Sequence, residues 1–209
     1  MDIVVANHTP DTVSVLLGKG DGTFLAMVDS AAGTGPFALA MGDLNGDGKH
    51  DAVVTNFYYE SSTMVSVLLA AGDGRLGPGQ GYRAGNGPNS VAVGDLNDDG
   101  KLDIVITNQW FVGTTVLLGN GDGTFRGGGG YAVGREPNSV ALGDLNGDGK
   151  LDIVTASGTL SLLLGAGDGT FAAKVEYAAG SGSVALGDLN GDGRLDIVAG
   201  TRVLLNACQ

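Results

Sequence analysis

A nine-residue acidic pattern occurs four times in this chain of 209 residues, and it restricts the fold more than any other feature. The copies are DLNGDGKHD at 43–51, DLNDDGKLD at 95–103, DLNGDGKLD at 144–152 and DLNGDGRLD at 188–196. Ca²⁺ takes six to eight oxygen ligands, and alternate side chains of a tight loop supply them where a glycine permits a sharp turn. Each copy has Asp, Asn, Asp and Asp at positions 1, 3, 5 and 9 and glycine at position 6. The pattern therefore predicts a calcium-binding loop.

In each loop we expect five ligands, namely the side chains at positions 1, 3, 5 and 9 and the backbone carbonyl at position 7. In chain order these residues are Asp43, Asn45, Asp47, Lys49 and Asp51; Asp95, Asn97, Asp99, Lys101 and Asp103; Asp144, Asn146, Asp148, Lys150 and Asp152; and Asp188, Asn190, Asp192, Arg194 and Asp196. About four Ca²⁺ ions are expected, one for each complete loop.

The pattern has two other interpretations, a plain hairpin turn and an EF-hand. Asn-Gly and Asp-Gly steps mark hairpin turns, but a turn needs only one such step, whereas here aspartate recurs at three fixed positions. An EF-hand closes with a glutamate at position 12 and continues into a helix. Position 12 is Val54, Ile106, Thr155 or Ala199, and β-branched apolar residues follow each loop. We therefore expect the loop to be the turn of a β-hairpin.

The charge of the chain agrees with this interpretation. The formal net charge is −12, which equals the charge of the twelve loop aspartates, so without a cation their repulsion opposes folding. An acidic chain does not suit nucleic acid or an anionic membrane surface as a partner, and no apolar run is long enough to insert into a bilayer. The one cysteine, Cys208, excludes an internal disulfide. Weak oxygen sites suit millimolar calcium, which favours a secreted protein in an extracellular or periplasmic setting.

The spacing of the loops predicts the architecture. The first aspartates are separated by intervals typical of a propeller blade, and one unit contains four short strands, expected at 139–145, 151–156, 160–164 and 172–178. A sheet that is apolar on both faces must pack between similar sheets. We therefore predict an all-β fold, a β-propeller of four-stranded antiparallel blades, with five blades of which the first and last are incomplete. The single domain 1–209 divides into units at about 1–34, 35–86, 87–135, 136–180 and 181–209.

The acidic loops and the apolar strands that follow them resemble the FG-GAP/VCBS repeat family, which includes the integrin α-subunit propellers. The chain departs from the integrin-type repeat in lacking Gly-Ala-Pro after the second strand, where Thr55-Asn56 and Thr107-Asn108 stand. The resemblance implies the propeller and the calcium sites rather than integrin-like ligand binding. Since the first unit lacks its first strand and the last unit lacks its fourth, a partial propeller that forms a homo-oligomer is the alternative to five blades.

Loops that differ between the units are expected on the face opposite the calcium loops. Variable loops on a repeated scaffold are common binding sites, and two of these loops carry aromatic residues beside amides and hydroxyls. They predict a site for a neutral carbohydrate or a protein surface, formed by Tyr58, Tyr59, Trp110 and Phe111. The alternative is that these rings pack between blades. The aspartates of a second motif, GDGTF or GDGRL, are turn residues or further calcium ligands: Asp21, Asp73, Asp122 and Asp168.

No catalytic residues are predicted. His8 and His50 are the only histidines, and no Ser-His-Asp or Cys-His set can be assembled from them. The main hypothesis is a calcium-stabilised, lectin-like or adhesive binding module without activity of its own. A purely structural or interaction array, or part of a larger propeller, is the first alternative. A calcium-dependent polysaccharide lyase, implied by lyases that resemble these repeats, is the second.

Overall fold

The structure, a computed structural model, describes residues 1–57, 64–110, 113–179 and 182–206. These residues form strands and no helices, in five antiparallel sheets. The strands are β1 (Ile3–Asn7), β2 (Thr12–Leu16) and β3 (Val28–Ala31); β4 (Pro36–Gly42), β5 (Asp51–Asn56), β6 (Met64–Leu68) and β7 (Gln80–Arg83); β8 (Pro88–Gly94), β9 (Asp103–Asn108), β10 (Gly113–Gly119) and β11 (Phe125–Tyr131); β12 (Ser139–Gly143), β13 (Asp152–Ala156), β14 (Leu160–Leu163) and β15 (Val175–Tyr177); and β16 (Val184–Gly187), β17 (Asp196–Ala199) and β18 (Arg202–Leu204).

Each sheet is a meander in which consecutive strands pair, as the order β4-β5-β6-β7 illustrates. The all-β, propeller-like fold predicted from the sequence is therefore confirmed. The strands of the unit at 139–178 lie where the sequence predicts them, except that β15 is only three residues long. Its shortness follows from the turn before it, where Gly165 and Phe171 form an isolated bridge and residues 172–174 leave the ladder.

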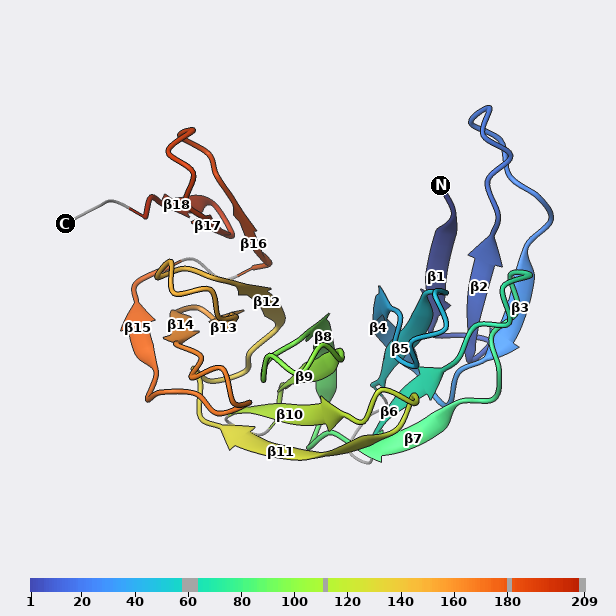
Figure 1. Ribbon diagram of the computed structural model, residues 1–209, viewed down its shortest axis with the longest axis horizontal. Coiled ribbons are helices and arrows are strands. Elements are labelled where there is room, and N and C mark those ends of the chain that lie inside the picture. Colours follow the sequence, from blue (N-terminus) through green and yellow to red (C-terminus); the bar gives the residue numbers. More distant parts are fainter. Residues whose placement is uncertain (58–63, 111–112, 180–181, 207–209) are drawn as a thin grey trace.

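The five sheets follow one another round an open arc, with β1–β3 at one end and β16–β18 at the other (Figure 1). The first strands of neighbouring complete sheets lie next to each other on the inside of the arc, as β4 and β8 do. The two end sheets have three strands each. Among the described residues no strand precedes β1 and none follows β18, as expected from the sequence.

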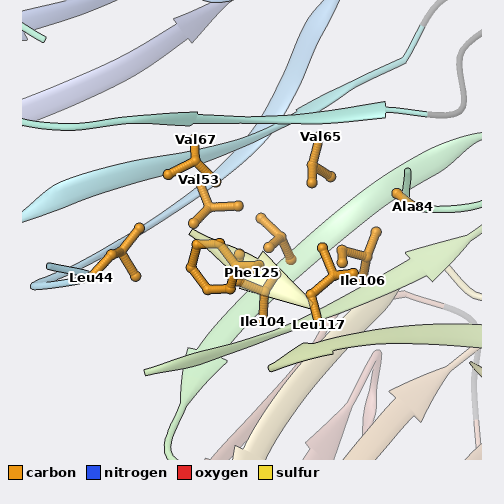
Figure 2. Packing of buried hydrophobic residues seen from close by; sticks show 10 residues of the cluster. Leu44, Val53, Val65, Val67, Ala84, Ile104, Ile106, Leu117 and Phe125 are labelled. Carbon is orange, nitrogen blue, oxygen red and sulfur yellow. The ribbon is translucent and has the colours of Figure 1, made fainter. Parts of the chain in front are cut away.

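Apolar side chains between neighbouring sheets form the core. Between the second and third sheets, Val53 and Val67 meet Ile104, Leu117 and Phe125 (Figure 2). Similar clusters lie at the other three boundaries. Burying one such side chain contributes about 1.5–3 kcal/mol. The core is thus divided into layers, and each sheet depends on its neighbours for burial of its faces.

The turns that carry the GDGTF motif also bind the preceding sheet. Phe125 lies edge-on to Tyr82, with ring centroids 5.5 Å apart, and Phe171 lies edge-on to Tyr131 at 5.1 Å. The N–H of Gly123 donates to the carbonyl of Leu44 in the acidic loop of the preceding sheet, at 3.1 Å. Each acidic loop in the middle of the array is therefore in contact with the next sheet.

Candidate calcium loops and an aromatic surface

The four acidic loops join the first and second strands of the second to fifth sheets, so all four lie at the same end of their sheets. Glycine at position 6 has a positive φ in every loop, as Gly48 (81°) and Gly100 (78°) show. Position 4 is also left-handed, with Gly46 at 74° and Asp98 at 56°. Glycine adopts this conformation without a steric penalty, and aspartate is among the few other residues that tolerate it.

The carboxylate at position 1 accepts hydrogen bonds from the backbone of its own loop. Asp43 Oδ1 accepts the N–H groups of Gly46 (2.8 Å) and Asp47 (3.1 Å), and Oδ2 accepts that of Gly48 (2.8 Å). Asn45 Oδ1 accepts the same Asp47 N–H at 3.0 Å. One backbone N–H, that of position 5, therefore donates to the side-chain oxygens of both position 1 and position 3. The same arrangement recurs at Asp95, Asp144 and Asp188.

The carboxylate at position 9 is buried and links two turns of its sheet. Asp103 Oδ2 accepts the N–H of Leu96 at 2.9 Å, and Oδ1 accepts the N–H of Gly119, at the end of the third strand, at 2.7 Å. Asp51, Asp152 and Asp196 make the equivalent pairs of bonds, and all four side chains are 0% exposed. Asp2 makes the second bond alone, to Gly18, at 2.8 Å. The sequence predicted position 9 as a ligand only, and this backbone-linking role was missed.

A buried carboxylate at position 9 and an exposed carboxylate at position 1 differ electrostatically. Burial raises the pKa of Asp51, backbone hydrogen bonds from Ala70 and Leu44 oppose the rise, and the nearby negative charges of Asp47 and Asp43 add to it. In the last loop Asp188 is exposed, and hydrogen bonds from backbone N–H groups, that of Gly193 above all, lower its pKa. The loop thus holds a buried carboxylate close to others of the same sign, an arrangement that a bound cation relieves.

The donors fit calcium by their chemistry, because carboxylate and amide oxygens are the ligands that this ion takes. Among the described residues, however, no three His, Cys, Asp or Glu side chains are already drawn together as a formed metal site. The loop oxygens face backbone N–H groups instead, and the ammonium of Lys49 lies 3.0 Å from Asp47 Oδ2. The calcium assignment therefore stays a prediction about the loops rather than an observed site.

The aspartates of the second motif have a turn role in the structure. Asp21 Oδ1 accepts the N–H of Thr23 at 2.9 Å, and its hydrogen bonds with the Thr23 hydroxyl and N–H lower its pKa. Asp73, Asp122 and Asp168 accept the N–H two residues on in the same way. These bonds are the reason for the motif, because aspartate stabilises a turn by bonding to its own backbone.

Aromatic side chains gather at the end of the sheets opposite the acidic loops. Phe57 follows β5 and lies between Phe37 of β4 and Trp110, which follows β9, with ring centroids 5.2 and 5.0 Å away. Phe37 is 56% exposed and Trp110 is 40% exposed. A Cβ added at Gly87 would lie 2.8 Å from the Trp110 ring, so the ring rests on the backbone there. We call Phe37, Phe57 and Trp110 the aromatic surface.

The aromatic surface differs in part from the predicted ligand site. Of the four residues proposed from the sequence, Trp110 belongs to it, whereas Tyr58, Tyr59 and Phe111 lie outside the described residues. The ring of Trp110 packs against Phe57 of the neighbouring sheet and remains partly exposed, and its role in ligand binding stays a prediction. Phe37 and Phe57 were not predicted, although the GPF step at the start of β4 and the position of Phe57 directly after a strand were visible signals.

The two histidines lie apart. His8 is in the exposed turn after β1, and His50 lines a cavity of about 430 Å³ between the first two sheets. Lys49, Arg75 and Asp2 line the same cavity. No charge relay of serine, histidine and aspartate is present among the hydrogen bonds of the described residues.

The fold and the loops define a class of protein, the propeller-like repeat array. The model of the FG-GAP-like repeat matches residues 1–54, 43–106, 99–155 and 147–199. The chain therefore belongs to the FG-GAP-like repeat family. No curated protein matches it by sequence. None of the described residues forms a helix long and apolar enough to cross a membrane.

A solved structure shares the fold. The rhamnogalacturonan lyase PL11 of Bacillus licheniformis is similar at a TM-score of 0.55 and 16% identity, over 93% of this chain and 48% of the lyase. The V. cholerae biofilm matrix protein Bap1 is similar at a TM-score of 0.47 and 16% identity, over 94% of this chain and 34% of Bap1. This chain thus spans about half of the lyase and a third of Bap1.

Proposed function

We propose that the chain is an extracellular, calcium-stabilised binding module that binds a neutral carbohydrate through its aromatic surface. The observation that carries the proposal is the row of Phe37, Phe57 and Trp110, which spans two sheets and leaves the outer rings about half exposed. Sugar rings bind to exposed aromatic faces because each ring offers a flat apolar platform.

The supporting geometry is the separation of the two ends of the sheets. The acidic loops follow the first strand of the second to fifth sheets, and the aromatic residues lie at the start of β4 and after β5 and β9. Strands of antiparallel sheets therefore place the two features at opposite ends. The acidic loops can stabilise the array without contacting the ligand, because they lie at the other end of the sheets.

A glycan array and tryptophan fluorescence test the proposal. Trp110 is the only tryptophan, so saturable quenching on addition of a glycan reports on this surface alone. We expect Trp110→Ala and Phe37→Ala to weaken glycan binding about tenfold or more, as loss of an aromatic contact at the centre of a site does. Tyr177→Ala is the matched control, since Tyr177 is 41% exposed and lies on β15, outside the aromatic surface. Binding that survives both test variants contradicts the proposal.

A protein surface is the alternative partner for the same rings. Unchanged Trp110 fluorescence with every glycan, together with loss of binding to a protein partner in Trp110→Ala, would assign the aromatic surface to protein recognition. The purely structural array remains if neither kind of ligand binds.

Lyase activity is a second candidate, favoured by one observation. Lys49, His50 and Arg75 line one cavity, and a histidine or lysine base beside cationic groups suits proton abstraction next to the carboxylate of a uronic acid. The direct assay is the ultraviolet absorbance of unsaturated products from an acidic polysaccharide. Activity that is lost in His50→Gln would support an enzyme; its absence with all acidic polysaccharides would leave the binding module.

A further inference from the structure

Neighbouring sheets of the chain pack through an apolar interface. The outer faces of the first and last sheets correspond to the two sides of that interface. On the side that faces the preceding sheet, Ile104 and Ile106 of β9 are 0% exposed. The corresponding residues of β1 are Ile3 and Val5, the first and third after the position-9 aspartate, and they are 39% and 41% exposed. The first sheet therefore presents the apolar side that the others bury against a predecessor.

The last sheet presents the opposite half. On the side that faces the following sheet, Val53 pairs with Val67 and Val105 with Val116, and all four are at most 2% exposed. The same positions in the last sheet are Val198 and its partner Val203, and Val203 is 55% exposed.

At each interface between two neighbouring complete sheets, and between the fourth and fifth, a leucine side chain of one sheet lies against a glycine of the preceding sheet. This contact fixes how the two sheets are aligned. A Cβ added at Gly42 would lie 2.5 Å from Leu102 of the next sheet, and the pairs Gly94–Leu151 and Gly143–Leu195 give 2.7 Å. At Gly187, the equivalent glycine of the last sheet, nothing lies within 4 Å. Met1 precedes Asp2 as Leu102 precedes Asp103, and it is fully exposed. The last sheet thus has a glycine, Gly187, with no side chain against it, and the first sheet has an exposed apolar side chain, Met1, at the position of the leucine.

We propose that these faces bind each other between two copies of the chain, with the β16–β18 face of one copy on the β1–β3 face of the second. Every copy carries both halves, so a second copy is a sufficient partner, and the ends of the arc are held apart within one copy (Figure 1). Head-to-tail contacts form a closed ring where the rotation allows it and an open chain where it does not. The net charge of −12 opposes association, so salt is expected to strengthen it.

The test is the solution mass of the protein by light scattering at increasing concentration, with calcium present. We expect association of the wild type and loss of it in both Val5→Glu and Val203→Glu, because each variant places a charge on one half. Val175→Glu is the matched control, a valine that is 46% exposed on β15. It should associate as the wild type does. Melting curves verify that each variant folds. If Val5→Glu does not fold, Ile3→Ser tests the same face, and if Val203→Glu does not fold, Ala185→Glu does so.

Mixing the two variants separates a head-to-tail contact from any other. Val5→Glu keeps its β16–β18 face and Val203→Glu keeps its β1–β3 face, so the mixture should form a one-to-one complex and no larger species. A wild type that is monomeric throughout, a mixture that stays monomeric, or loss of association in Val175→Glu would each overturn the proposal. None of these outcomes depends on glycan binding by the aromatic surface.

Discussion

Asp103 holds Gly119 by a 2.7 Å hydrogen bond from the Gly119 N–H to its Oδ1 oxygen, between the neighbouring strands β9 and β10. The other carboxylate oxygen accepts the N–H of Leu96 in the acidic loop. A residue expected only to bind a metal is thus also the connection between the acidic loop and the third strand.

Asp103→Ala is therefore expected to destabilise the protein even in the presence of EDTA. Two buried N–H groups lose their acceptor, at a cost of about 1–3 kcal/mol each. Denaturant unfolding without calcium measures the effect. Asp99→Ala is the comparison, because Asp99 is an exposed ligand candidate at position 5, and its loss should matter chiefly when calcium is present. Equal destabilisation of the two variants in EDTA would contradict the linking role of Asp103.

Calcium removal should lower the melting temperature. A ligand that binds only the folded state stabilises it by about 2.7 kcal/mol for each site at a hundredfold excess over Kd. In a chain of this size each 1 kcal/mol moves the melting temperature by about 2–4 °C. Calorimetry with calcium and with EDTA makes the comparison. Identical curves, after metal analysis shows that the protein is free of calcium, would refute the calcium assignment.

Asp144→Ala should weaken calcium binding about tenfold or more, since charge count sets the affinity of such loops. Asp98→Gly is the paired control. Asp98 occupies a position that is glycine in the other loops, with φ at 56°. Glycine removes the backbone strain of the folded state but raises the conformational entropy of the unfolded chain, so the two effects on stability oppose each other. We expect a stability change within about 0.5 kcal/mol. Calcium titration calorimetry of both variants decides, and equal losses of affinity would show that the ligands are wrongly assigned.

Thr23→Val should raise the pKa of Asp21 back toward its ordinary value of 3.8. The Thr23 hydroxyl and N–H stabilise the charged carboxylate, and the substitution removes the hydroxyl. Because the folded pKa is depressed, this stabilisation is present above pH 3.8 and is lost as the pH falls through the lowered folded value. NMR titration of the Asp21 carboxyl measures the shift. Asp21 lies in the first sheet, which has no complete acidic loop, so calcium binding to such a loop does not alter the measured pKa.

The repeated elements could be predicted from the sequence because local chemistry determines them. Glycine at left-handed positions and aspartate in turns mark each hairpin, and β-branched runs such as Ile104–Ile106 form the strands between them. Counting the turn motifs and the β-branched runs between them predicted the number of strands and the three-stranded end sheets.

Contacts between units could not be predicted in the same way. The aromatic surface depends on a register shift between Pro36 and Leu39 that places Phe37 near Phe57, and a shift of register leaves no mark in the hydrophobic pattern. The second bond of Asp103 lies within one sheet, but it too depends on strand register, which places Gly119 at the end of β10 near Asp103 at the start of β9. Only the three-dimensional arrangement of the sheets brings these groups together.

The bond from the Gly123 N–H to the Leu44 carbonyl has a consequence for how the array opens. The same bond joins Gly169 to Leu96, so the amide protons of Gly123 and Gly169 exchange with solvent only when the acidic loop of the preceding sheet moves away. Nearest-neighbour coupling of this kind makes repeat arrays cooperative. Leu189 of the last loop is 53% exposed, with no following sheet among the described residues. Hydrogen exchange at Gly123 and Gly169 should therefore report the opening of the acidic loops at Leu44 and Leu96, one sheet away from each amide.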